Sequence, residues 1–129
     1  MTLPAPGTVL SSDRTLTQAD FDRFAAISGD DNPIHVDPEF SGRTRFGRTV
    51  SHGMLLYTVF WGLLRQALPG MRQVTQTLMF PAPAYADEPL TFTATVETAA
   101  ADRVALTIRV FRIACGTTVC EGRAEMGVQ

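Results

Sequence analysis

The sequence predicts an α+β domain in which an antiparallel β-sheet wraps around one long buried helix. Three observations favour this class. The 129 residues suit a single domain, 1–129, with one hydrophobic core. Residues 51–66 form a helical segment that is apolar on nearly every face, which is typical of a helix enclosed in a core. The last third of the chain alternates apolar and polar residues with the period of β-strands.

The first predicted helix begins after an irregular start. Residues 1–14 contain two prolines and a glycine and read as a loose segment. Thr17 has the chemistry of an N-cap, and Asp20 follows three residues later, as in a capping box. Apolar residues then recur at helical spacing until Gly29, where the helix is expected to end.

A long polar segment, residues 29–50, separates this helix from the apolar one. Its prolines and glycines break any long element, although Pro38 is suited to open a short helical turn. A loop of 22 residues is long for a compact domain, and such loops are often functional.

The strands are predicted after the apolar helix. Residues 73–80 read as a weak strand, and clearer strands follow at 90–97, 104–110 and 120–126, where apolar residues face opposite polar ones. Gly116 is expected in the turn between the last two strands. The predicted order is therefore helices first, followed by an antiparallel meander.

Charge and composition exclude several function classes. The 11 basic residues are all arginine and are outnumbered by 13 acidic ones, so no basic excess supports nucleic-acid binding. The absence of lysine excludes a Schiff-base or P-loop lysine.

The sequence favours a cytoplasmic location. The longest apolar run, residues 54–64, is too short for a membrane span of about 20 residues. The first 14 residues lack a charged start followed by an apolar stretch, so we expect no secretory signal and no membrane partner. Cys115 and Cys120 are expected to be free thiols, with a disulfide across a hairpin as the alternative.

Asp30 and His35 are the candidate catalytic pair. They lie five residues apart in a polar run with a proline between them, so they can converge from one loop on one water. A carboxylate that accepts a proton and an imidazolium that donates one suit general acid–base chemistry. A metal centre of His35, Asp37 and His52 is the alternative, but the ligand spacing is atypical and we expect no metal.

Gly53 is a candidate for binding a substrate oxygen. It stands at the start of the apolar helix, where backbone N–H groups lack intrahelical partners and carry partial positive charge. A glycine there lets an oxygen approach the backbone closely, as an oxyanion hole for a thioester enolate requires. The alternative is that Gly53 is an ordinary helix-start residue.

The sequence does not favour a serine hydrolase. Ser28 is the serine of the polar run, and it lacks the glycine-flanked elbow of that enzyme class.

Residues 24–55 carry a family resemblance. They read F-x-x-x-S-G-D-x-N-P-I-H-x-D-x-x-F and then F-G-x-x-x-x-H-G-M-L, and they resemble the MaoC-like, R-specific enoyl-CoA hydratases, which are single hot-dog domains. The resemblance implies a lyase without a cofactor. It would add water reversibly to a trans-2-enoyl thioester, either acyl-CoA or acyl-carrier-protein, to give an R-3-hydroxyacyl thioester.

The resemblance also implies residue roles. Asp30 and His35 would hold and activate the water, Asn32 would order the loop, and the Gly53 N–H would bind the thioester oxygen. Trp61 departs from the family, which often has a small residue there lining the acyl pocket, so we expect Trp61 to limit the acyl chain.

Two alternatives and two further expectations remain open. A hot-dog thioesterase usually carries a carboxylate on the buried helix, and residues 51–66 have none. A non-catalytic acyl-binding or assembly subunit would not need to keep the motif residues, so their presence disfavours this alternative.

We expect a homodimer, because so small a sheet leaves apolar surface and strand edges uncovered. Arg43, Arg45 and Arg48 are expected to assist binding of the phosphates of CoA or phosphopantetheine.

Overall fold

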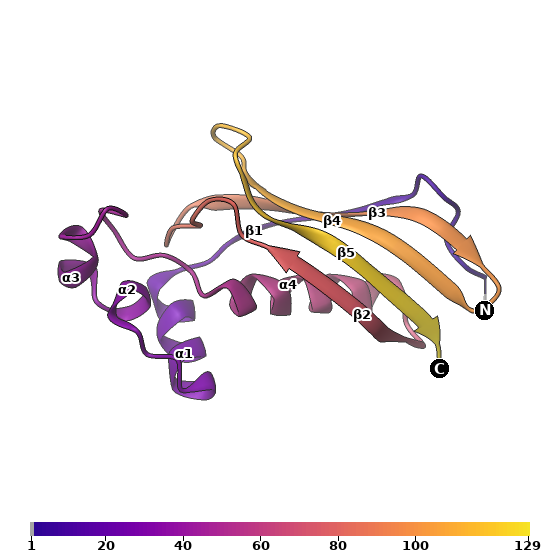
Figure 1. Ribbon diagram of the computed structural model, residues 1–129, viewed down its shortest axis with the longest axis horizontal. Helices are drawn as coiled ribbons and strands as arrows, with labels where there is room; N and C mark the ends of the chain where they lie inside the picture. The colour runs from indigo at the N-terminus through magenta and orange to yellow at the C-terminus, as the bar shows by residue number, and fades with distance from the viewer. Residues whose placement is uncertain (1) are drawn as a thin grey trace.

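The computed structural model describes residues 2–129 and contains one five-stranded antiparallel sheet with a long helix across one face (Figure 1). The strand order in the sheet is β1-β3-β4-β5-β2. Three shorter helices gather at the end of the sheet where the long helix α4 begins (Figure 1). The elements in chain order are β1 (Val9–Thr15), α1 (Gln18–Ser28), α2 (Pro33–Val36), α3 (Pro38–Gly42), α4 (Gly53–Ala67), β2 (Met71–Met79), β3 (Pro89–Ala100), β4 (Arg103–Arg112) and β5 (Thr118–Val128).

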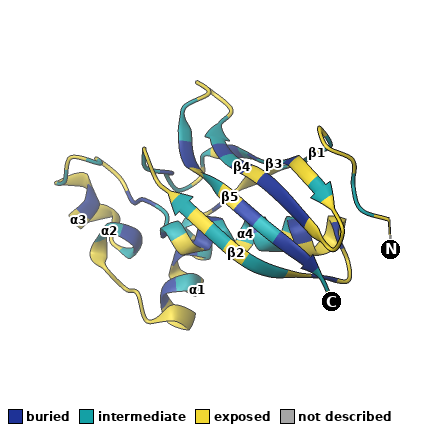
Figure 2. Cartoon of the chain, turned by 45° about the vertical axis from the view of Figure 1, so that its right-hand side comes forward, coloured by how far each residue is buried: buried dark blue, intermediate teal, exposed yellow. Residues whose placement is uncertain are grey.

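The core lies between α4 and the concave face of the sheet. Alternate residues of β3, β4 and β5 are buried, as Figure 2 shows by the alternating bands along these strands. The rings of Phe60 on α4 and Phe92 on β3 meet edge to face with centroids 5.3 Å apart. The predicted α+β class and the alternation of the last three strands are therefore confirmed.

Helix α1 begins and ends as predicted. The Thr17 hydroxyl accepts from the backbone N–H of Asp20, and the Asp20 carboxylate accepts from the Thr17 N–H, which completes the capping box. Gly29 closes the helix with a φ of 80°, a left-handed conformation that glycine adopts without strain. The polar segment 29–50 therefore begins at a tight turn directly after α1.

Two predictions about chain order are wrong. Residues 1–14 were predicted to be loose, but from Val9 onward they form most of the edge strand β1, which pairs with β3 from Val9↔Thr95 to Thr15↔Pro89. This strand is mostly polar and exposed, so its stability comes from pairing with β3 and not from an apolar pattern of its own. Strand β2 pairs with β5 at the opposite edge, so the sheet is not a simple meander that follows the helices.

The polar segment 29–50 contains two short helices, α2 and α3, and α3 begins at Pro38, where a short helical turn was expected.

Helix α4 is less enclosed than its sequence predicts. Leu55, Leu56, Phe60 and Leu64 are buried, but Met54 is 52% exposed. Other apolar side chains of α4, namely Tyr57, Val59, Trp61 and Leu63, are only partly buried. The prediction of a helix buried on every face is wrong for the single chain, because the sheet covers only one side of the helix.

Two smaller expectations concern the membrane and the thiols. Within residues 2–129, no helix is long and apolar enough to cross a bilayer. The cytoplasmic location stays a prediction. Both cysteines are free thiols, as expected, with Cys115 exposed and Cys120 buried in β5.

Candidate active site

A cavity of about 600 Å³ opens where α4 begins, beside α1 and α2. Its walls are mostly apolar, and a few polar groups from the segment 28–53 converge on it. Segment 80–84 and Val119 of β5 supply much of the apolar wall. The lining includes Asp30, His35, Arg45, His52, Gly53 and Phe80.

Asp30 reaches the cavity because the end of α1 is held in one shape. The Ser28 hydroxyl donates to the carbonyl of Phe24 at 2.7 Å and accepts from the N–H of Asp30 at 3.1 Å. Together with the left-handed Gly29, these bonds fix the backbone that carries Asp30. Its side chain is 55% exposed, so the carboxylate can reach both water and a ligand.

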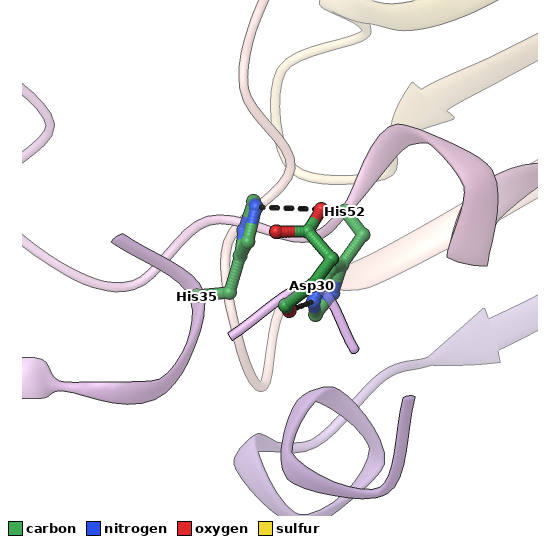
Figure 3. A group of neighbouring side chains, drawn as sticks. All are labelled: Asp30, His35 and His52. Carbon is green, nitrogen blue, oxygen red and sulfur yellow. Dashed lines mark hydrogen bonds and ion pairs between the residues drawn. The ribbon is translucent and has the colours of Figure 1, made fainter. Parts of the chain in front are cut away.

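His35 is buried and lies on the short helix α2. Asn32 caps this helix by accepting from the N–H of Ile34 at 3.1 Å. The Nδ1 atom of His35 is 2.7 Å from the carbonyl oxygen of Val50. Because a carbonyl can only accept, Nδ1 carries the proton, and Nε2 then holds a lone pair in the neutral ring. That Nε2 atom faces Asp30 Oδ2 at 3.8 Å (Figure 3).

His52 completes the group. Its ring stacks on that of His35 with centroids 3.9 Å apart and planes 25° apart. Its Nε2 atom is 2.9 Å from the backbone carbonyl oxygen of Asp30, as the second dashed line in Figure 3 marks. Burial lowers the pKa of His52, because desolvation disfavours the charged imidazolium.

Gly53 begins α4 under the ring of Phe80. No side chain caps the first turn of α4, so its N–H groups face the cavity end of the helix without a capping partner from the described residues. A Cβ placed on Gly53 would lie 2.6 Å from the Cζ atom of Phe80. Only a glycine therefore fits beneath this ring as it stands.

The structure separates the predicted site residues into two sets. Asp30, His35 and Gly53 all line the cavity. Asn32 is exposed and caps α2, and it is not among the lining residues. Trp61 is half-buried against the core and also lies outside this lining.

The metal alternative is not assembled as the sequence suggested. The Asp37 carboxylate accepts from the N–H of Phe40 and caps α3, away from the two histidines. Asp30, His35 and His52 do lie within 4.8 Å of one another, but the two stacked rings direct their lone pairs along nearly parallel planes. One nitrogen of each ring bonds a backbone carbonyl, which leaves Nε2 of His35 and Nδ1 of His52 as the unprotonated nitrogens.

Of the three arginines expected to contact phosphate, only Arg45 lines the cavity. Arg43 pairs with Glu39 on the surface at 3.3 Å. Arg48 pairs with Glu88 at 3.6 Å and lies over the ring of Tyr85. The Arg45 guanidinium lies over the Phe46 ring at the cavity, where it is available to an anionic part of a ligand.

Sequence reasoning missed several cavity residues. Phe24, Phe80 and Val119 line the cavity, yet each looks like an ordinary core residue in the sequence. The prolines after Phe80 were the available signal, because they end β2 and turn the chain toward the start of α4. His52 was considered only as a metal ligand.

Comparisons with known proteins agree on one family. A family model described as MaoC like domain matches residues 3–112. The (R)-specific enoyl-CoA hydratase of Aeromonas caviae is 41% identical over 92 residues, which cover 68% of this chain and 69% of that protein. The enzyme of the same name from Rhodospirillum rubrum is 32% identical over 117 residues, covering 89% and 81%. The solved (R)-hydratase of A. caviae, described as involved in PHA biosynthesis, superposes with a TM-score of 0.92 at 33% identity and covers 98% of each chain.

Proposed function

The chain belongs to the MaoC-like domain family, and on that premise we propose that it adds water reversibly to a trans-2-enoyl thioester to give an R-3-hydroxyacyl thioester. It is a hydratase/dehydratase with the hot-dog fold of the R-hydratases, as the motif in residues 24–55 predicted. The observation that carries the residue assignment is the pair Asp30 and His35, whose side chains meet in a cavity at the start of α4.

The pair is suited to hold one water. Asp30 Oδ2 and the unprotonated Nε2 of His35 are both acceptors and lie 3.8 Å apart. A single water can donate to both at about 2.8 Å each. Its oxygen lone pairs then remain free to attack, which is the orientation that addition to C3 needs.

Asp30 and His35 together gain one proton and lose one proton in the reaction. As the water oxygen bonds to C3, the water loses one proton to Asp30, and the C2–C3 π electrons move toward the thioester carbonyl. The Asp30–His35 pair returns one proton to C2. The elements of water are added across the double bond, and the pair ends with the number of protons it had at the start. The reverse sequence removes water from the hydroxyacyl thioester.

The start of α4 suits the thioester oxygen. Charge develops on that oxygen when C3 is attacked, and the Gly53 N–H at the positive end of α4 would stabilise it. The space that a Cβ on Gly53 would take is filled by the ring of Phe80, so the backbone N–H is the group of Gly53 that would receive the oxygen. In this arrangement the acyl chain enters the apolar part of the cavity, and Arg45 at its lining is the residue best placed for a phosphate of CoA or of a carrier-protein arm.

We also propose that the protein is a homodimer. The outer side of α4 presents the partly exposed apolar residues Val59 and Leu63 along its flank next to α1. A shallow groove of about 340 Å³ between α1, β1 and α4 follows this side of the helix. A second copy of the chain would bury these residues. The helix would then be covered on both sides, as its apolar sequence predicts.

Hydration of crotonyl-CoA tests the proposed activity. The wild-type protein is expected to consume the enoyl absorbance, and Asp30→Asn and His35→Ala are each expected to lower the rate by about 10²–10⁴-fold. Asp31→Asn is the matched control, because Asp31 is exposed, adjacent and outside the cavity lining. Near-wild-type turnover in Asp30→Asn would exclude the assigned mechanism. Release of free CoA thiol in place of hydration would instead support the thioesterase alternative.

A further inference from the structure

His52 is the one buried polar side chain of the cavity that the proposed reaction does not use. The residue is 2% exposed, and its ring is enclosed by the rings of His35, Phe21 and Phe24. Only one of its two ring nitrogens, Nε2, has a hydrogen-bond partner among the described residues. A buried imidazole with this asymmetry has a defined protonation state.

The partner of Nε2 decides that state. Nε2 lies 2.9 Å from the backbone carbonyl oxygen of Asp30, which can only accept, so Nε2 carries the proton. Nδ1 is buried and has no hydrogen-bond partner within residues 2–129, so it holds the lone pair of the neutral ring. An imidazolium would add a second N–H at Nδ1 with nothing to receive it, which is costly in a buried place. Burial lowers the pKa of His52 in the same direction.

The ring also restrains the other member of the pair. It lies flat against the His35 ring, with centroids 3.9 Å apart, while Val50 holds the Nδ1–H of His35. These two contacts leave the His35 ring little freedom to turn away from Asp30. His52 therefore touches both members of the pair, one through a hydrogen bond to its backbone and the other through its ring face (Figure 3).

We infer that His52 is a positioning residue, which holds the backbone of Asp30 by its Nε2–H and the ring of His35 by stacking, so that both face one water. The inference rests on the proposed function, because its benefit is the geometry of the Asp30–His35 pair. It assigns His52 no proton transfer of its own, since its only proton is already bonded to a carbonyl. A displacement of about 1 Å in either partner can cost up to about 100-fold in rate.

The test compares two amides that differ by one methylene. In His52→Gln the amide NH₂ lies near the position of Nε2 and can still donate to the carbonyl of Asp30. In His52→Asn the amide NH₂ lies near Nδ1 and falls short. We expect His52→Asn to lower kcat for crotonyl-CoA about 10- to 100-fold with little change in KM, and His52→Gln to recover most of that loss. His52→Phe, which keeps a ring but no donor, is expected to resemble His52→Asn.

Equal kcat values for the Gln and Asn variants would overturn the inference. So would a wild-type rate in His52→Phe. The proposed function fails separately, if the wild-type protein does not hydrate enoyl thioesters or if Asp30→Asn remains active. Should the variants not fold, the ¹⁵N spectrum of the wild-type imidazole decides: a proton on Nε2 and a bare Nδ1 support the inference, and a proton on Nδ1 overturns it.

Discussion

At the scale of single residues, the two histidines have opposite protonated nitrogens because each bonds a different backbone carbonyl. Val50 accepts from Nδ1 of His35, and Asp30 accepts from Nε2 of His52. His35 is left with a lone pair that faces the Asp30 carboxylate, whereas His52 is left with one that faces no described partner. In the proposed reaction, His35 takes part in proton transfer, and His52 is proposed to hold the Asp30–His35 pair in position.

The lowered pKa of His52 predicts a loss of stability in acid. Below its ordinary value of 6.5 the unfolded chain binds a proton at this residue that the folded chain does not bind. The contribution is fully present above pH 6.5, and the free energy of unfolding falls as the pH drops below it. Urea unfolding at pH 7 and pH 5 should show a smaller pH dependence in His52→Gln than in the wild type. An unchanged difference between the two pH values would contradict the buried neutral ring.

Trp61 is expected to limit the acyl chain even though it does not line the cavity. The cavity reaches only Gly53, Met54 and Leu56 on α4, so it stops before the indole, which packs against the core further along the helix. We expect Trp61→Ser to raise activity on longer acyl-CoA chains relative to crotonyl-CoA. A chain-length profile and a melting temperature measured on the same variant decide this. A destabilised protein with an unchanged profile would mean that Trp61 is a core residue only.

At the scale of elements, the glycines of β5 show where the sheet tolerates a side chain. A Cβ on Gly122 would lie 1.9 Å from the backbone carbonyl oxygen of Thr77 on β2. A Cβ on Gly127 would meet the tip of the Val74 side chain at 3.2 Å. The first contact is with backbone that is held in the ladder, and the second is with a side chain that can adjust.

We therefore expect Gly122→Ala to lower the free energy of unfolding by about 3 kcal/mol or more, since β2 must separate from β5 to admit the methyl group. Gly127→Ala, in the same strand and the same ladder, should cost less than about 1 kcal/mol. Chemical denaturation of both variants measures the difference. Similar losses for the two substitutions would show that the close approach of β2 at Gly122 is not a constraint.

At the scale of the whole molecule, the proposed homodimer depends on the outer side of α4. A homodimer should scatter light with twice the mass of the 14.0 kDa chain at micromolar concentration. Val59→Glu places a charge in the groove beside α1 and should shift the protein toward monomer. Ala67→Glu is the matched control, because Ala67 is exposed on the same helix and outside that groove. A wild-type monomer, or equal masses for the two variants, would contradict the dimer.

The sequence determined the features that neighbouring residues encode. The capping box of Thr17 and Asp20, the glycine that ends α1 and the alternation of β3 to β5 were all predicted, because each depends on residues a few positions apart. The motif that contains Asp30 and His35 was predictable for the same reason. Both residues lie within one short segment whose turn is set by Gly29 and the cap of α2.

Only the tertiary structure decided which distant segments meet. The edge strand β1 depends on pairing with β3, about 80 residues later. The ring of Phe80 lies over Gly53 because β2 ends beside the start of α4, and His52 bonds the carbonyl of Asp30 across 22 positions of chain. Such contacts depend on how the sheet curves over the helix, and no pattern among neighbouring residues specifies that curvature. For the same physical reason, the sequence showed that α4 is apolar but not that the sheet covers only one of its sides.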